Sequence, residues 1–521
     1  MRRALLALLL LVLPAMVCEV RAQDDDDDEE ALELDIEAAP AAAPRMHFKA
    51  DMPVQFDAVE IQAEVAADGS FSATAGGVQD IAWFREQVTM GQVPEPGTLS
   101  PEGLLSEHDL PARKTGPCPR LLCVLGETGL VAIDHRPELA VLSQLGFDSK
   151  LTASTYVRPP LNLVALVDQS GSMGGRPIEQ IKVSLLVLYR QLRPQDRLSV
   201  VVVDDGARVL LEPTPGGDPA PLHRVLPEIG PWGRTRLSAG LSEAIALAER
   251  SAQGFDGLTR VISFSDQRPN AGATDPQSFV AQARRAADKG VGLTHVAVGV
   301  AADPTFVTEI SAVKGGNAYS FPDLERMVEV FRDELDTLAV PLAYDMALEV
   351  APAAGWRLAG VYGIPGAALV WDSTGAARLK IETLFLSTKG GAIYLAFAPE
   401  GVSDMPATPP QVGSAVATVG LSYQPVEGAP VLETLGLAVE PGTHRSDGLA
   451  RGVVLVSEIE ALLAATRAWH AGDPAGALEA LTPTFRRLEA NGDPELIAEL
   501  WLVGQLWRVI AAQVPEGAAL D

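Results

Sequence analysis

Between residues 161 and 339, short apolar runs alternate with amphipathic stretches of helical period, and this alternation strongly constrains the fold. Strands that helices cover on both faces of a sheet read as nearly continuous apolar runs. The apolar runs cover residues 161–167, 198–203, 260–264, 292–298 and, more weakly, 318–321. The helical stretches cover residues 177–192, 237–251, 276–289, 304–313 and 324–339. The pattern predicts an α/β fold with a doubly wound, mostly parallel sheet over residues 158–340.

The regions before and after this sheet have different hydrophobic patterns. With 521 residues, the chain is long enough for roughly three packed units. Residues 46–157 mix strand-like pieces with a predicted helix at 79–90, which indicates a leading α+β module. Residues 341–445 carry short alternating runs separated by glycine and proline, the pattern of an antiparallel β-sandwich. Residues 446–521 return to helical spacing, and two Gly-Asp-Pro turns divide them into three predicted helices.

The N-terminus has the features of a secretory signal. Arg2 and Arg3 precede a leucine- and alanine-rich run, and small or apolar residues stand before Gln23. We therefore expect a signal peptide over residues 1–22, followed by an acidic and Ala-Pro-rich disordered linker over 23–45. This predicts an exported protein of the periplasm, the cell surface or the extracellular space. A lipid anchor at Cys18 is an alternative, which the bulky Val17 before it disfavours.

Two cysteines remain after residue 22, and they are close in sequence. Cys118 and Cys123 are separated by four residues, and export permits them to pair. A zinc site is disfavoured because no further cysteine and no nearby histidine is available. A local disulfide is the favoured interpretation, with two reduced cysteines as the alternative.

Charge and hydropathy limit the classes of partner. The formal net charge is −28, which disfavours nucleic acid as a partner. After the N-terminal run, no apolar segment reaches the ~20 residues that cross a bilayer. We expect no membrane span in the mature chain.

A cluster of oxygen-bearing side chains follows the first apolar run. Asp168, Ser170 and Ser172 alternate in an Asp-x-Ser-x-Ser loop between the predicted first strand and first helix. Ligands of doubly wound sheets bind beyond the carboxyl ends of the strands, where this loop lies. Thr235 and Asp266 occupy loops at the same predicted edge. These five oxygen donors suit a hard divalent cation, Mg²⁺ or else Ca²⁺ or Mn²⁺; the alternative is that Ser170 or Ser172 merely caps the helix.

At these residues the chain resembles the von Willebrand factor A (VWA) family and its metal-ion-dependent adhesion site (MIDAS). The resemblance implies that the hydroxyls bind the metal directly, that the aspartates act partly through water, and that a partner's Asp or Glu completes the shell. The third loop departs from the family's Thr-Asp-Gly, since here it reads Ser265, Asp266 and Gln267. Residues 79–110 also look like the segment that precedes this domain in bacterial surface proteins.

These features favour adhesion over catalysis. The seven histidines are scattered, and no phosphate loop or His-Glu-x-x-His motif is present, so we expect no catalytic residues and no enzyme. His295 falls within a predicted buried strand and is interpreted as a core residue. A structural envelope protein, whose metal only stabilises the fold and whose partners contact the sandwich or the helical tail, is the alternative from another class.

Two further features lie near the predicted site. Trp232, three residues before Thr235, is a candidate for its rim, although most tryptophans anchor cores. The doublet of Asp204 and Asp205 is interpreted as a turn rather than as a second metal site.

Overall fold

The computed structural model describes the chain from residue 71 to residue 514, with gaps. The gaps are residues 76–80, 115, 153–155, 235, 267–275, 299–305, 307–308, 311, 322–323, 334, 336–338, 365–368, 373–374, 388, 404–409 and 442–445. The predicted signal peptide, the linker and Cys18 therefore lie outside the described residues. Within the described part, no helix is long and apolar enough to cross a membrane.

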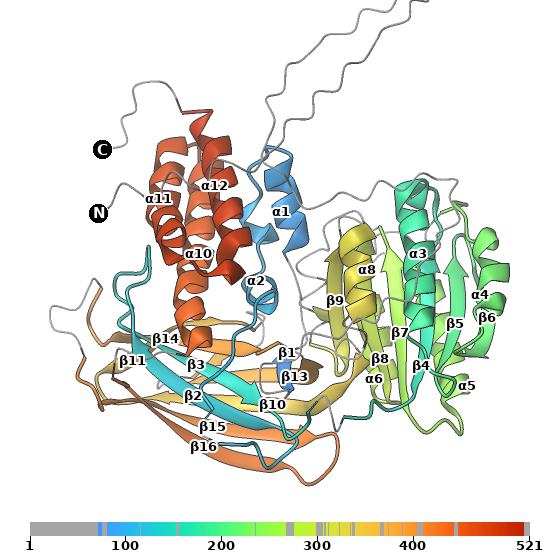
Figure 1. Ribbon diagram of the computed structural model, residues 1–521, viewed down its shortest axis with the longest axis horizontal. Helices are drawn as coiled ribbons and strands as arrows, with labels where there is room; N and C mark the ends of the chain where they lie inside the picture. Colours follow the sequence, from blue (N-terminus) through green and yellow to red (C-terminus); the bar gives the residue numbers. More distant parts are fainter. Residues whose placement is uncertain are drawn as a thin grey trace, which may run out of the picture. The chain divides into compact units, whose positions relative to one another are not determined.

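The predicted α/β sheet is present and has six strands in the order β6-β5-β4-β7-β8-β9 (Figure 1). Neighbouring strands are parallel except β5 and β6, which are antiparallel. The strands are β4 (Leu161–Asp168), β5 (Arg197–Val203), β6 (Ala207–Pro215), β7 (Leu258–Ser265), β8 (Val291–Val298) and β9 (Gly316–Phe321). The chain leaves β4 toward β5 on one side and later returns to β7 on the other side. This reversal of direction at the carboxyl end of β4 is where doubly wound sheets bind ligands.

Helices cover both faces of the sheet, as the apolar runs predicted. Along β4, Leu163, Ala165 and Val167 contribute to one core cluster, and Val164 and Leu166 contribute to the cluster on the opposite face. The first cluster includes side chains of α3 (Arg176–Arg190) and α8 (Leu324–Asp333). The second includes side chains of α5 (Leu237–Ala252) and α6 (Pro276–Ala287). Burial on both sides explains why β4 carries no exposed residue.

Two antiparallel sheets form the β-sandwich. The larger sheet has the order β1-β13-β10-β15-β16, with β12 beside β13, and the smaller sheet has the order β11-β14-β3-β2. Their strands are β1 (Ser72–Ala75), β2 (Cys123–Leu130), β3 (Val141–Asp148), β10 (Pro341–Pro352), β11 (Trp356–Tyr362), β12 (Leu369–Trp371), β13 (Ala377–Ser387), β14 (Ala392–Pro399), β15 (Ala415–Pro425) and β16 (Val431–Ala438). One apolar cluster joins side chains of both sheets.

Strands from the predicted leading module belong to these two sheets. Strand β1 pairs with β13, and β3 pairs with β14 through a register that sets Leu145 opposite Ile393. Residues 46–157 and 341–445, which the sequence analysis placed in separate units, therefore share both sheets in the described residues.

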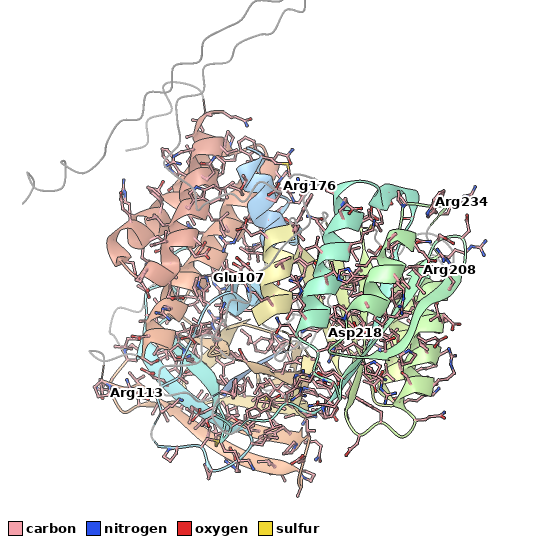
Figure 2. The ribbon with its side chains drawn as sticks, turned by 45° about the vertical axis from the view of Figure 1, so that its right-hand side comes forward. Glu107, Arg113, Arg176, Arg208, Asp218 and Arg234 are labelled. Atoms are coloured by element: carbon pink, nitrogen blue, oxygen red, sulfur yellow. A yellow bond between two sulfur atoms is a disulfide. The ribbon has the colours of Figure 1, made fainter. Side chains whose placement is uncertain are left out.

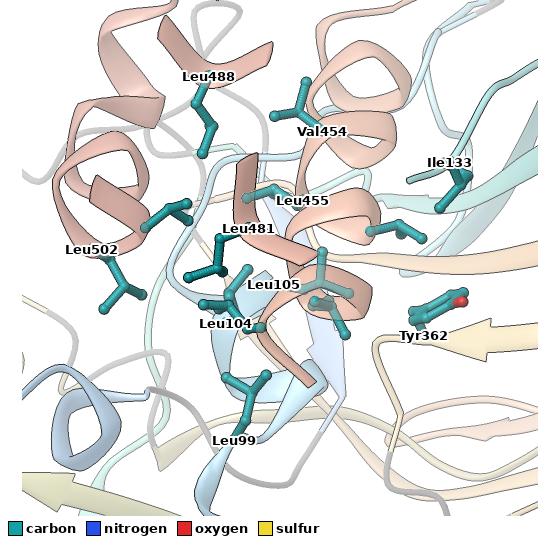
Figure 3. Close-up of a cluster of buried hydrophobic side chains, with 14 of the residues drawn as sticks. Leu99, Leu104, Leu105, Ile133, Tyr362, Val454, Leu455, Leu481, Leu488 and Leu502 are labelled. Carbon is teal, nitrogen blue, oxygen red and sulfur yellow. The ribbon is translucent and has the colours of Figure 1, made fainter. Parts of the chain in front are cut away.

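Three helices follow the sandwich, as predicted: α10 (Asp447–His470), α11 (Pro474–Asn491) and α12 (Ile497–Ala511). They share a core with α1 (Ala82–Thr89) and α2 (Pro101–Ser106) and with one face of the smaller sheet. Figure 3 shows Leu104 and Leu105 of α2 among Leu455, Leu481 and Leu502 of the three helices. The smaller sheet is thus covered on both faces, because Tyr394 and Ala396 contact this helical core while Leu395 and Phe397 face the other sheet.

Candidate metal centre

The loop after β4 carries the predicted Asp-x-Ser-x-Ser motif. Strand β4 ends at Asp168, and α3 begins at Arg176 after Gly175, which adopts a positive φ of 82°. A non-glycine residue is disfavoured in that conformation, so Gly175 permits the sharp turn into the helix. The motif therefore lies in a tight loop at the carboxyl end of the central strand.

Asp168 is a fully buried carboxylate. Its Oδ1 accepts the backbone N–H of Ser170 at 2.9 Å, and its Oδ2 accepts the Ser265 hydroxyl at 2.6 Å. Burial raises the pKa of Asp168, although these hydrogen bonds oppose the shift. Across the described residues, no lysine, arginine or histidine forms an ion pair with this carboxylate. Its negative charge is therefore held by neutral donors alone.

Three further predicted ligands lie together with it. The Oγ atoms of Ser170 and Ser172 are 3.0 Å apart, and Ser172 Oγ donates to Asp266 Oδ1 at 3.1 Å. Burial raises the pKa of Asp266, and the charge of Asp168 adds to the increase. The backbone N–H of Asp266 also donates to Met173 Sδ at 3.1 Å. Two carboxylates and two hydroxyls from loops almost a hundred residues apart thus converge at one edge of the sheet.

Thr235, the fifth predicted ligand, lies outside the described residues, but the loop that carries it contacts the first loop. The N–H of Trp232 donates to Gln169 O at 2.6 Å, and the N–H of Gly171 donates to Gly233 O at 3.2 Å. On the other side of Thr235, the N–H of Arg236 donates to Asp204 O at 3.1 Å. The second loop is therefore anchored on both sides of the threonine.

The residues of this edge match a known family in sequence. A model of the von Willebrand factor type A domain matches residues 163–268, the stretch that contains all five predicted ligands. The chain contains a VWA domain. The match extends to relatives: YfbK, an uncharacterized protein of Escherichia coli strain K12, is 28% identical over 203 residues, which cover 38% of this chain and 35% of YfbK.

Other relatives of the VWA domain align over similar lengths. The human inter-alpha-trypsin inhibitor heavy chain H4 is 24% identical over 197 residues, which cover 36% of this chain and 21% of the heavy chain. A solved von Willebrand factor type A structure from Catenulispora acidiphila is 14% identical, with a TM-score of 0.48 over 74% of this chain and 91% of that chain. The aligned region thus spans about a third of YfbK and a smaller part of the heavy chain.

The side chains of the VWA loops suit a hard cation. Within the described residues, no three His, Cys, Asp or Glu side chains gather as a metal site. Any metal bound here would therefore depend on serine and threonine hydroxyls as well as on Asp168 and Asp266. Oxygen donors of this kind are the ligands that Mg²⁺, Mn²⁺ and Ca²⁺ prefer. The charge of Asp168, which is buried and has no ion-pair partner among the described residues, is consistent with such an ion.

Gln169 is a residue of this edge that the sequence analysis did not single out. Its side chain is fully buried, and its Nε2 donates to Asp204 Oδ2 at 2.8 Å. The backbone N–H of Gln169 donates to Val203 O at 2.9 Å. The parallel register sets Asp168 opposite Val203 and so brings Gln169 to Asp204, but the sequence alone does not give this register.

The acidic doublet forms a turn, as predicted. The N–H of Asp204 donates to Gly206 O, and Asp204 Oδ1 accepts the N–H of Gly206, both at 2.9 Å. The hydrogen bond from Gly206 is the main cause of a lowered pKa for Asp204, and burial opposes it. Asp205 is exposed beside Gly233.

Three other residues singled out from the sequence do not belong to this cluster. Cys118 and Cys123 form a disulfide, with Cα atoms 5.9 Å apart. His295 is buried in β8 between Phe279 and Phe306, with ring centroids 6.1 and 5.0 Å away. Burial lowers the pKa of His295 to about 4, which fits the predicted core role.

Proposed function

We propose that this chain is an exported protein that binds other proteins through a single divalent cation. The ion, Mg²⁺ or else Mn²⁺ or Ca²⁺, would be held by the side chains of Asp168, Ser170, Ser172, Thr235 and Asp266. A partner's Asp or Glu side chain would complete its coordination. The proposal of export rests on the sequence of residues 1–22.

The observation that carries this proposal is the convergence of two carboxylates and two hydroxyls, with no neutralising basic side chain among the described residues. Asp168 raises the pKa of Asp266, so the two negative charges repel each other at this edge. A divalent cation would offset that repulsion and the desolvation of Asp168. Ser170 and Ser172 would supply neutral ligands, which leave the bound ion electrophilic.

The chemistry of these ligands favours capture of a carboxylate over hydrolysis. Metal-assisted hydrolysis needs a general base near the ion. The described histidines with a contact in the structure lie elsewhere in the chain: His108 contacts Glu499, His135 contacts Ala480, His470 contacts Pro94, and His295 lies among phenylalanines. We therefore propose a binding function without catalysis.

The experiment that tests this proposal is a pull-down from envelope extract with residues 23–521 as bait. The bait is used in magnesium, in chelator, and with the substitution Asp168→Ala. Asp288→Ala provides the matched control, because Asp288 is an exposed acid outside the site. We expect partners that are captured in magnesium by the unmodified chain and by the control variant.

The same partners should be lost in chelator and with Asp168→Ala. Partners retained under all conditions would contradict the proposal. In that case the contacts belong to the sandwich or the terminal helices, and any cation is a structural element of the fold.

A further inference from the structure

We propose that Trp232 is the apolar anchor of the partner interface beside the cation site. The partner would be a protein segment that carries an aromatic or other large apolar side chain next to its acidic residue. This inference rests on the proposed function, because it assigns the partner a second feature besides the carboxylate.

Trp232 is unusually exposed for a tryptophan of this chain. Its exposed fraction is 65%, against 47% for Trp371 and Trp501, whereas Trp469 and Trp507 pack against the helical core and Trp356 packs against the sandwich core. A single exposed apolar residue needs no explanation by itself. What distinguishes Trp232 is its position on the loop that also carries Thr235.

Hydrogen bonds hold this tryptophan directly against the motif loop. Its N–H donates to the carbonyl of Gln169, which lies between the predicted ligands Asp168 and Ser170. The next residue, Gly233, accepts the N–H of Gly171, which lies between Ser170 and Ser172. The backbone of Trp232 is thus one hydrogen bond away from the backbone of the candidate ligand loop.

The indole ring is folded back against Gly230 of its own loop, and Pro231 of that loop approaches Gly174. A Cβ atom on Gly230 would lie 3.1 Å from Trp232 Nε1, and one on Gly174 would lie 3.5 Å from Pro231 Cβ. Gly230 therefore leaves the space that the indole occupies. The ring sits on its own backbone and keeps most of its surface in solvent.

The buried residue Gln169 holds the loop that carries Trp232 in place. Gln169 binds the Trp232 N–H through its carbonyl, Val203 through its N–H, and Asp204 through its side chain. Asp204 in turn accepts the N–H of Arg236 beyond Thr235. A side chain held on a rigid loop loses little conformational entropy on binding, and tryptophan is enriched among the residues that dominate interface energies.

Three exposed arginines belong to the loop of Trp232, to β6 and to α3 of this strongly acidic protein. Arg176, Arg208 and Arg234 are all exposed, and Figure 2 labels Arg176 at the start of α3 and the other two toward the outer edge of the VWA domain. Arg208 lies opposite Val202, two residues before Asp204, and after the hydrogen bond from Gly206 its charge also lowers the pKa of Asp204. Arg208 also pairs with Glu228 at 3.7 Å, but both side chains are about half exposed, so the pair is weak. Because the exposed Asp205 lies beside Gly233 on the same edge, the cation itself would attract the acidic residue of the partner, and the arginines would only partly offset the nearby aspartates.

The test uses a phage library of random 12-residue peptides and the full mature chain in magnesium, with chelator for elution. We expect the eluted peptides to carry Asp or Glu next to Phe, Tyr, Trp or Leu. A synthetic copy of the most enriched peptide should bind Trp232→Ala roughly tenfold to a hundredfold more weakly than the unmodified chain. Trp232→Phe should retain part of the affinity.

Trp501→Ala is the matched control, because Trp501 is 47% exposed on α12, outside the VWA domain. Equal melting temperatures for the variants exclude unfolding as the cause of lost binding. Acidic, chelator-eluted peptides that bind Trp232→Ala with unchanged affinity would overturn this inference and leave the proposed function standing. A selection without acidic, chelator-eluted peptides would contradict the proposed function and the inference together.

Discussion

The environment of Asp168 is the strongest indication of a cation site in the VWA domain. A carboxylate with no exposed surface and no cationic partner in the described chain costs free energy when it is ionised, and the raised pKa of Asp168 reflects this cost. The sequence predicted that Asp168 ends a strand, as the structure shows, because a strand-terminal aspartate followed by alternating serines is a local pattern. Its burial depends on the folded sheet.

Replacement of Asp168 by asparagine tests whether its charge serves a cation. In chelator, we expect Asp168→Asn to melt at the same or a higher temperature than the unmodified chain, because no buried charge remains. In magnesium at a hundredfold excess over Kd, the unmodified chain should gain about 2.7 kcal/mol of stability, and the variant should gain none.

Differential scanning calorimetry measures both effects, with Asp288→Asn as the exposed control. A magnesium-dependent rise in melting temperature that persists in Asp168→Asn would show that the ion stabilises the fold from another site.

His295 makes the VWA domain sensitive to acid for a separate reason. Its folded pKa of about 4 lies below the ordinary 6.5, so the unfolded chain binds a proton that the folded chain excludes. Stability is therefore complete above pH 6.5 and falls as the pH drops toward 4. At about 1.4 kcal/mol per pKa unit, the loss is roughly 3 kcal/mol.

The substitution His295→Leu should flatten the pH dependence of unfolding between pH 6.5 and 4. Denaturant melts across this range measure it, with the exposed His223→Asn as control. An unchanged slope in His295→Leu would mean that His295 is not held neutral.

At the scale of elements, the close approach of α10 to β14 depends on one glycine. A Cβ atom on Gly452 would lie 2.2–2.5 Å from the ring and hydroxyl of Tyr394. Tyr394 is fully buried, and its hydroxyl donates to Gly448 O at 2.6 Å, so the ring has no room to move. The helix can pack on the smaller sheet because position 452 lacks a side chain.

Gly452→Ala should therefore destabilise the fold by about 1–3 kcal/mol through overpacking. Gly97→Ala is the matched control, because a Cβ atom there meets nothing within 4 Å. Thermal melts compare the two, and equal melting temperatures would show that the helix can shift without cost.

Helices α10 and α12 also bury a pair of carboxyl groups, Glu458 and Glu499. Glu499 accepts hydrogen bonds from Arg85 and His108, and its pKa falls to about 2 against the effect of burial. Glu458 has a strongly raised pKa, caused first by burial and then by the charge of Glu499. The folded chain thus keeps a proton on Glu458 that the unfolded chain releases above pH 4.5, so stability falls as the pH rises.

Glu458→Gln keeps a neutral side chain of the same size, and we expect it to stabilise the chain at pH 8 by about 1–3 kcal/mol. Glu499→Gln should instead cost about 3 kcal/mol or more, because Arg85 loses a buried partner. Chemical denaturation at pH 5 and pH 8 measures the free energy of unfolding of both variants and of the unmodified chain. Stabilisation by Glu458→Gln at pH 5 equal to that at pH 8 would contradict a titrating Glu458.

Buried elements were predictable from the sequence, and exposed edge strands were not. The apolar run at 161–167 predicted β4 to within one residue, because a strand covered on both faces must be apolar throughout. Strand β6 was missed, since it lies at the edge of the sheet and only Leu211 along it is buried. The helix predicted at 324–339 is α8, which the structure describes as Leu324–Asp333.

At the scale of the molecule, the sandwich combines segments that are far apart in the chain. Strand β3 lies between β2 and β14 in the smaller sheet. The residues of β14 come about 250 positions after those of β3, and the VWA domain lies between these two strands in the sequence. Hydrophobic patterns report the period of a segment but not its partner in a sheet. The sequence therefore predicted strands in both regions without predicting that they share sheets.

The candidate site was predictable from the sequence because its position does not depend on which distant strands pair. Its predicted ligands come from the carboxyl ends of parallel strands, and these ends meet at one edge whenever such a sheet forms. Asp168 and Asp266 needed no knowledge of side-chain packing to be placed together. The bracing by Gln169 needed the register of β4 and β5, which only the folded sheet supplies.

The measurement that tests the central claim most directly is a calorimetric titration of magnesium into the chelator-treated mature chain. We expect one ion per chain, and we expect binding to be lost in Asp168→Ala and in Ser170→Ala. Asp205→Ala, which removes a neighbouring exposed carboxylate, should bind as the unmodified chain does. Magnesium binding that survives in Asp168→Ala, or that is absent from the unmodified chain, would contradict a cation site at this edge of the VWA domain.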